Sequence, residues 1–129
     1  LSLVAVQDGQ LVGHVLFSPV SSEFDLFGKH LLGLAPLAVS PERQKQGIGG
    51  QLIRRGLEIA LASGWDAIFV LGSPAYYARF GFSGVTEWNL TCSYSAQAQE
   101  FMAVTLKPHG LDGCGGVVSY HPLFQQFGV

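Results

Sequence analysis

The sequence is poor in charged residues, which make up 12% of its 129 residues, and seven Lys and Arg stand against nine Asp and Glu. Disordered chains are rich in charge and poor in aliphatic residues, so a hydrophobic content of 48% excludes that class and suffices for a substantial core. The chain has a formal net charge of −2, whereas nucleic-acid-binding domains are typically basic. The length fits one domain.

Cysteine is also scarce. Cys92 and Cys114 are the two in the sequence, and their spacing matches neither a metal site nor a framework of several disulfides. Two reduced thiols in a cytoplasmic protein are the simpler interpretation, and a disulfide is the alternative. No apolar run approaches the ~20 residues that a membrane-spanning helix needs, and no signal-peptide pattern is visible. Because the chain begins with Leu1 inside a strand-like run, we expect residues to precede it.

The first apolar runs predict a β-hairpin. Leu1–Gln7 and Gln10–Phe17 flank Asp8-Gly9, and Asp-Gly between apolar runs is the strongest short-range hairpin signal. The next residues, 18–29, contain a proline, serines and a glycine, which together predict a loop.

The segment His30–Val39 is apolar throughout, as in a central strand that is covered on both faces. It nevertheless contains Pro36, which lacks the N–H group that a sheet ladder uses. We therefore expect a bulge at Pro36 or a local parting of this strand from its neighbour.

Helical periodicity follows from Gly47 to Ser63, with Arg54 and Glu58 at the i,i+4 spacing that favours an ion pair. Residues 66–71 predict a short buried strand, and Ser73-Pro74 opens a second, short helix that ends near residue 81. Strand-like runs cover about 87–94 and 101–107, and the tail from residue 108 matches no element clearly. This order predicts one α/β domain around a mixed sheet.

The segment Val39–Gly50 is the one that points to chemistry. A buried strand passes through a turn into a helix, with glycines at positions 47, 49 and 50. The first N–H groups of a helix have no partner inside it, and together with the helix dipole they attract anionic oxygens. Four of the seven basic residues lie in the acid-free stretch 43–55: Arg43, Lys45, Arg54 and Arg55. We expect a small ligand with a phosphate or pyrophosphate group.

Two common phosphate-binding patterns are excluded. A P-loop requires Gly-Lys-Ser/Thr, but Gln51-Leu52 follows Gly49-Gly50. The dinucleotide pattern G-x-G-x-x-G fails because Leu52 stands where its last glycine is needed. No acidic ribose-binding residue is evident about 20 residues further on.

Another pattern does match. Gln44-Lys45-Gln46-Gly47-Ile48-Gly49 resembles the Gln/Arg-x-x-Gly-x-Gly/Ala signature of the GNAT superfamily of N-acetyltransferases. In that family the signature follows a bulged strand, as Pro36 suggests here, and a later helix ends in a Tyr-x-x-x-Gly-Phe segment. That second segment is Tyr77 to Phe82 in this sequence, and the wording of Pro74–Phe82 is similar to the YhbS-like branch.

The resemblance implies a GNAT-type α/β fold: a mixed, partly splayed sheet of about six strands with helices on both faces. Residues 1–129 would form a single acetyltransferase domain that lacks the family's first strand and helices. The implied reaction transfers an acetyl group from acetyl-CoA, the co-substrate, to a primary amine by direct attack, without a metal. The alternative is a non-catalytic CoA-binding or regulatory domain.

The resemblance also implies roles for individual residues. Backbone groups of Leu37, Ala38 and Val39 would pair with the pantetheine amides. The signature residues Gln44 and Lys45, with the backbone N–H groups of Gln46, Gly47, Ile48, Gly49 and Gly50, would hold the pyrophosphate. Tyr77 would protonate the leaving thiolate, although this tyrosine and Tyr76 also fit an aromatic core cluster.

The general base is left open between a chain of water molecules and five residues: His14, Glu23, Asp25, His30 and Glu87. The acceptor is expected to be a small-molecule or peptide amine rather than a nucleic acid or a membrane. A homodimer and a cytoplasmic location complete the expectations.

Overall fold

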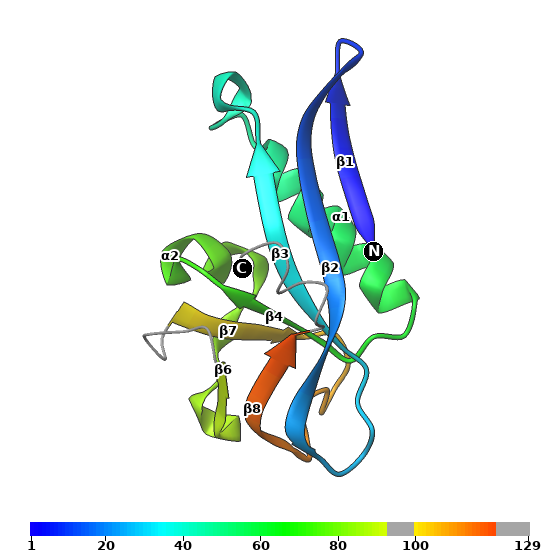
Figure 1. Ribbon diagram of the computed structural model, residues 1–129, viewed down its shortest axis with the longest axis vertical. Helices are drawn as coiled ribbons and strands as arrows, with labels where there is room; N and C mark the ends of the chain where they lie inside the picture. The colour runs from blue at the N-terminus through cyan, green and yellow to red at the C-terminus, as the bar shows by residue number, and fades with distance from the viewer. Residues whose placement is uncertain (93–99, 121–129) are drawn as a thin grey trace.

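The structure, a computed structural model, describes residues 1–92 and 100–120 (Figure 1). Its strands are β1 Ser2–Gln7, β2 Gln10–Asp25, β3 Leu31–Val39, β4 Ala67–Leu71, β5 Ser83–Gly84, β6 Leu90–Cys92, β7 Phe101–Thr105 and β8 Cys114–Tyr120. Its helices are α1 Ile48–Ala62 and α2 Pro74–Tyr77, and its short 3-10 helices are η1 Pro41–Arg43, η2 Ala78–Phe80 and η3 Thr86–Trp88. These described strands form one mixed sheet in the order β5-β7-β4-β3-β2-β8-β6, and β1 pairs with β2.

The β1–β2 hairpin is confirmed. Asp8 and Gly9 form its turn, with φ of 53° and 76°. A two-residue turn of this kind needs positive φ at both positions, which is why Asp-Gly is favoured there. The antiparallel register runs from Gln7 opposite Gln10 to Ser2 opposite Leu16.

Strand β2 is longer than expected, because the predicted loop at residues 18–29 is a strand as far as Asp25. On one edge of β2, pairing with β1 ends at Leu16 and pairing with β8 begins at Val20. Pro19 lies between these two partners, where its missing N–H costs the ladder little. The unassigned tail supplies β8. The predicted strand at residues 87–94 is wrong at its start, where η3 ends at Trp88, and right over β6; its last two residues lie outside the described residues.

Strand β3 has the bulge and the parting that Pro36 predicted. Its register with β2 passes from Leu34 opposite Phe17 to Leu37 opposite Val15, so two residues of β3 face one of β2. Its parallel pairing with β4 ends at Leu34. Figure 1 shows β3 and β4 diverging beyond this point, which leaves the last five residues of β3 with an open edge.

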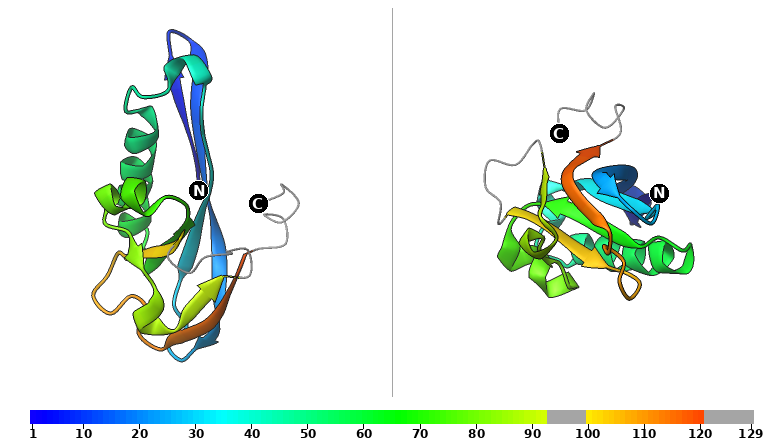
Figure 2. Two further views of the ribbon diagram at one scale, coloured as in Figure 1. Left: turned by 90° about the vertical axis from the view of Figure 1, so that its left-hand side faces the viewer. Right: turned by 90° about the horizontal axis from the view of Figure 1, so that it is seen from below.

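The two faces of the sheet carry separate apolar cores. Helix α1 contributes Leu52, Ile53 and Ala60 to the first, together with Phe80 of η2. Figure 2 shows both α1 and α2 on this side of the sheet. The second core is covered by η3, β6 and β8, and includes Trp88 and the stacked pair Phe69 and Phe101. Helical segments therefore pack on both faces, and the expected fold class is confirmed.

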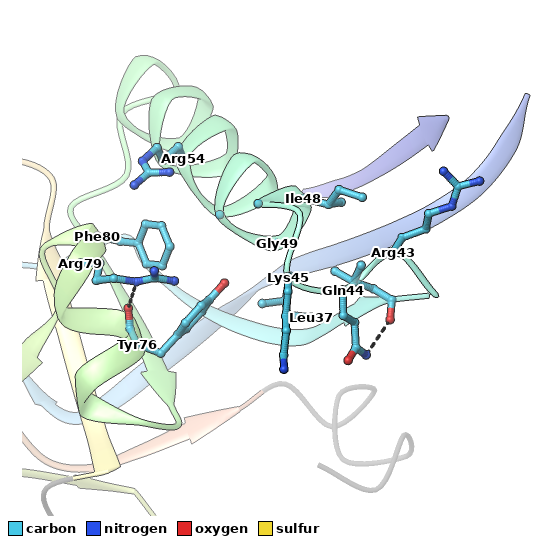
Figure 3. A pocket seen from close by; sticks show the side chains of 13 residues that line it. Leu37, Arg43, Gln44, Lys45, Ile48, Gly49, Arg54, Tyr76, Arg79 and Phe80 are labelled. Atoms are coloured by element: carbon cyan, nitrogen blue, oxygen red, sulfur yellow. Dashed lines mark hydrogen bonds between the residues drawn. The ribbon is translucent and has the colours of Figure 1, made fainter. Parts of the chain in front are cut away.

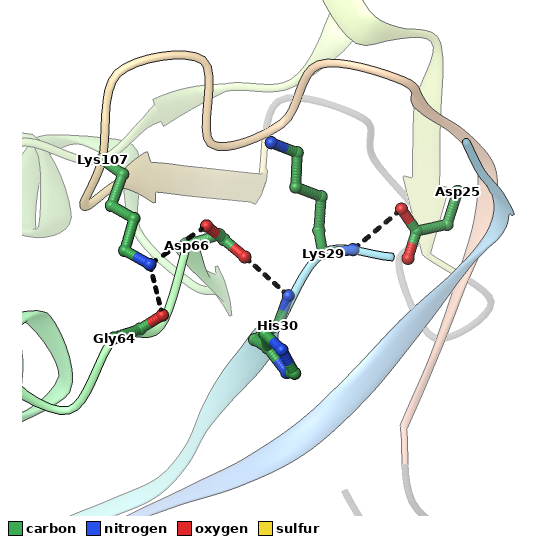
Figure 4. A network of polar contacts seen from close by, with 6 residues as sticks. All are labelled: Asp25, Lys29, His30, Gly64, Asp66 and Lys107. Atoms are coloured by element: carbon green, nitrogen blue, oxygen red, sulfur yellow. Dashed lines mark hydrogen bonds and ion pairs between the residues drawn. The ribbon is translucent and has the colours of Figure 1, made fainter. Parts of the chain in front are cut away.

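A polar network fixes the start of β3 (Figure 4). Asp66, just before β4, accepts a hydrogen bond of 2.7 Å from the backbone N–H of His30 and pairs with Lys107 at 3.6 Å. Lys107 also donates to the carbonyl oxygen of Gly64 at 2.7 Å. These contacts join β3, β4 and the segment after β7 at the end where β3 and β4 are paired, opposite the end where they part.

Candidate functional site

The parting of β3 and β4 opens a cavity of about 630 Å³. It is bounded by the end of β3, the turn that follows, the start of α1, and the α2–η2 segment on the far side (Figure 3). Its lining residues are Leu37, Val39, Arg43, Gln44, Lys45, Gly47, Ile48, Gly49, Gly50, Arg54, Tyr76, Arg79 and Phe80. Four of these are cationic, and none carries a carboxylate.

The N-terminus of α1 faces this cavity without a side-chain cap from the described residues. Gly47 precedes the helix in a left-handed conformation, with φ of 83°, which glycine adopts without strain. The first helical hydrogen bond joins the N–H of Gln51 to the carbonyl of Gly47. The N–H groups of Ile48, Gly49 and Gly50 therefore have no acceptor within the helix and are available to an anion.

The turn before α1 is held by its own side chains. Gln44 donates from Nε2 to the carbonyl of Val39 at 3.1 Å, and Lys45 has a positive φ of 65°. Gln46 bonds to the carbonyl of Glu42 and does not line the cavity. Arg43 donates from Nη1 to Oε1 of Gln7 at 2.6 Å, so this guanidinium is tied to β1.

The side chains of β3 alternate across the opening, as a strand requires. Those of Leu37 and Val39 line the cavity, whereas Ala38 lines a smaller hollow that it shares with His14. Neighbouring residues of a strand turn their backbone groups to opposite edges, and the N–H of Ser40 donates to the carbonyl of Val12 in β2. The backbone groups of Ala38, which were expected to contact the ligand, therefore face β2, whereas those of Leu37 and Val39 lie on the open edge. An extended, amide-bearing ligand arm fits this edge as an added strand.

The two adjacent tyrosines differ in position. Tyr76 lines the cavity, and its hydroxyl oxygen lies 3.0 Å from the point that a Cβ atom on Gly49 would occupy. Tyr77 lies outside this lining and packs edge-to-face against Phe82, and its ring lies so close to Gly72 that it fills the space a side chain there would need. Burial, and next the neighbouring Tyr76, raise the pKa of the Tyr77 phenol above its ordinary value. Tyr77 therefore stays protonated at neutral pH.

Sequence reasoning missed three cavity residues, Tyr76 as a lining side chain, Arg79 and Phe80. The signal that finds them is their spacing: positions i, i+3 and i+4 share one face of a helical turn. Arg79 lies over the Tyr76 ring at 4.6 Å, and Tyr76 meets Phe80 edge-to-face at 5.3 Å.

None of the five candidate bases lines the cavity. His14 contacts Ser2 at 3.1 Å, Glu23 accepts a hydrogen bond from the N–H of Val117, and Asp25 accepts one from the N–H of Lys29. The site therefore presents no carboxylate or imidazole base of its own within the described chain. In the same residues, no group of three or more His, Cys, Asp or Glu side chains has the arrangement of a metal site.

Residues 1–82 match the acetyltransferase (GNAT) family. The chain is 39% identical to YhbS of Escherichia coli, an uncharacterized N-acetyltransferase, over 98% of this chain and 75% of that protein. The crystal structure of Escherichia coli YhbS in complex with CoA superposes with a TM-score of 0.87 at 37% identity, covering 99% of this chain and 71% of that one. A Brucella melitensis GNAT acetyltransferase in complex with acetyl-CoA gives a TM-score of 0.72 at 38% identity, over 95% and 67% of the chains.

The splayed mixed sheet thus lies beside a helix start whose free N–H groups, those of Ile48, Gly49 and Gly50, form an anion cradle, and this defines the class as an α/β domain that binds an anionic ligand. The chain belongs to the GNAT family of N-acetyltransferases, and the YhbS-like resemblance is confirmed. Among the described residues, no helix has both the length and the apolar character that crossing a membrane requires.

Proposed function

We propose that this chain transfers an acetyl group from acetyl-CoA to a primary amine by direct attack, within one domain formed by residues 1–129. The observation that carries the proposal is that one cavity joins an open strand edge to an uncapped helix N-terminus. CoA needs both, because its pantetheine arm carries amides and its nucleotide end carries phosphates. Related structures at 37% and 38% identity hold CoA and acetyl-CoA.

The binding roles follow the cavity. Within 37–39, the backbone groups on the open edge pair with the pantetheine amides, and the N–H groups of 46–50 receive the pyrophosphate at the positive end of the α1 dipole. The side chain of Gln44 braces the turn through Val39. Lys45 lines the same cavity and adds positive charge.

The reaction requires two proton movements. The amine nitrogen attacks the thioester carbonyl carbon, the carbon–sulfur bond breaks, and the sulfur takes a proton as it leaves. We assign that proton to the phenol of Tyr77, which stands at the tyrosine position of the Tyr-x-x-x-Gly-Phe segment and lies against Gly72 near the fork of β3 and β4. A phenol is protonated at neutral pH and can therefore act as the acid. The nitrogen releases its proton to water or to a base on the acceptor side. Holding the amine against the thioester supplies much of the acceleration.

We propose a small-molecule or peptide amine as the acceptor. The cationic residues of the lining suit the phosphates of the co-substrate, so they are not evidence for a nucleic acid as the acceptor. A cytoplasmic location and a homodimer are likewise proposals. The alternative is a domain that binds CoA through the same cradle but has no turnover. The presence of Tyr77, the proposed acid, favours the enzyme over this alternative.

Calorimetric titration with acetyl-CoA tests the cradle, with ATP and NAD as phosphate-bearing controls. We expect binding of acetyl-CoA alone, followed by thiol release when amines are screened as acceptors. Binding of all three ligands with similar affinity would contradict a CoA-specific site. Binding of acetyl-CoA without turnover on any amine would favour the regulatory alternative.

A further inference from the structure

Two arginines from different elements meet on one aromatic ring at the edge of the cavity (Figure 3). The guanidinium of Arg54, from α1, lies 4.9 Å from the centroid of Phe80, and that of Arg79, from η2, lies 5.5 Å from the same centroid. Phe80 is buried, with 9% of the residue exposed, so its ring is a fixed platform for both cations. Arg79 is held further by its hydrogen bond of 3.4 Å to the carbonyl of Tyr76.

Neither guanidinium has a carboxylate partner among the described residues. The i,i+4 spacing predicted an ion pair between Arg54 and Glu58, but the structure pairs Glu58 with Arg55 at 3.2 Å instead. Arg54 turns the other way, toward the start of its helix. Its Nη1 atom lies 3.2 Å from the point that a Cβ atom on Gly50 would occupy. Two uncompensated positive charges therefore lie beside the anion cradle.

We propose that Arg54 and Arg79 form a second phosphate subsite, which binds the 3′-phosphate monoester of CoA. The inference rests on the proposed function, because it assigns a further part of the same ligand. The N–H groups at the start of α1, which have no side-chain cap, are the proposed site of the pyrophosphate. A phosphate monoester carries about two negative charges at neutral pH, and guanidinium forks match its oxygens. The four cations of the lining then match the ligand's phosphates in charge.

The test compares acetyl-CoA with acetyl-dephospho-CoA, which lacks only the 3′-phosphate, by calorimetric titration. We expect the unaltered protein to bind acetyl-CoA at least about tenfold more tightly than the dephospho compound. Arg54→Gln and Arg79→Gln should each remove most of this difference in affinity, because each should weaken the binding of acetyl-CoA. Affinity for the dephospho compound should change less than about twofold. Arg54→Lys and Arg79→Lys, which keep the charge, should retain part of the preference.

Arg55→Gln is the matched control, because Arg55 is the next residue on α1, is exposed and pairs with Glu58 outside the cavity. It should leave both affinities unchanged. An equal loss for both ligands in the Arg54 and Arg79 variants would assign these arginines to the pyrophosphate and overturn the proposal. Equal binding of both ligands by the unaltered protein would also overturn it. Failure of that protein to bind either ligand would instead refute the proposed function.

Discussion

Gly49→Glu is the sharpest test of the anion cradle, because it puts a side chain and a negative charge where the phosphates are proposed to lie. A Cβ atom on Gly49 would lie 3.0 Å from the Tyr76 hydroxyl oxygen and 3.8 Å from side-chain atoms of Leu37 and Val39. The added carboxylate therefore projects among the residues that line the cavity. Two unit charges about 5 Å apart repel by about 1–3 kcal/mol at effective dielectric constants between water and a protein surface.

Two phosphate charges roughly double that repulsion to about 2–6 kcal/mol, so the charge alone should lower acetyl-CoA affinity at least about thirtyfold. Gly49→Gln has the same size without the charge and should cost only about tenfold. Folding should not suffer, because a glycine in a helix costs up to about 1 kcal/mol and an acidic residue in the first turn is favourable. Calorimetric titration and thermal unfolding of both variants separate these effects. Equal losses of affinity would refute the electrostatic reasoning, and unchanged affinity in Gly49→Glu would place the site elsewhere.

Three further predictions concern chemistry and stability. Tyr77→Phe should lower kcat with unchanged acetyl-CoA affinity, and an unchanged kcat would remove Tyr77 as the acid. Because burial raises the pKa of the phenol, kcat of the unaltered enzyme should fall only above pH 10.0. Gly56→Ala should destabilise the fold by about 1–3 kcal/mol in urea unfolding, since the new Cβ overlaps the fully buried ring of Phe17, and a more stable variant would contradict this packing. Asp66→Asn should lower the free energy of unfolding by about 1 kcal/mol, because it weakens the charged hydrogen bond to the His30 N–H. Acetyl-CoA affinity should stay unchanged, and a loss of affinity would show that the start of β3 influences the site.

The raised pKa of Tyr77 also has a consequence for stability. A group whose pKa is higher in the folded state than in the unfolded chain stabilises the fold below its unfolded value. That contribution is present at neutral pH and is lost as the pH rises from 10.0, the ordinary value, through the raised value. The alkaline side of the stability curve should therefore flatten in Tyr77→Phe.

Features set by neighbouring residues were predictable from the sequence. The turn at Asp8-Gly9, the glycine-rich start of α1 and the Ser73-Pro74 start of α2 each depend on a few adjacent residues. The structure has all three, including the hydrogen bond that the Ser73 hydroxyl accepts from the N–H of Tyr76. The bulge at Pro36 belongs to the same group, because a residue without an N–H disturbs its own ladder.

Features set by distant partners were not predictable in the same way. The second half of β2 is a strand because it pairs with β8, which lies almost at the other end of the described chain. The serines and Pro19 of this segment are also typical of a loop. A half-exposed strand has polar residues at every second position, so its local composition is similar to that of a loop. The tail that forms β8 was unassigned for the same reason.

The tyrosine pair shows how local spacing and spatial placement combine at the site. Successive residues of a helix lie a little over a quarter turn apart, so only one of two adjacent tyrosines can face a given cavity. Tyr76 takes that position opposite Gly49, at the end of the cavity where the phosphates are proposed to bind. Tyr77 instead lies against Gly72, directly after β4 and close to the point where β3 and β4 part. An arm that runs from the α1 N-terminus along the open edge of β3 ends near that fork. We therefore propose that Tyr77, which lies outside the cavity lining, meets the thioester at this fork, while Tyr76 faces the phosphate end of the cavity.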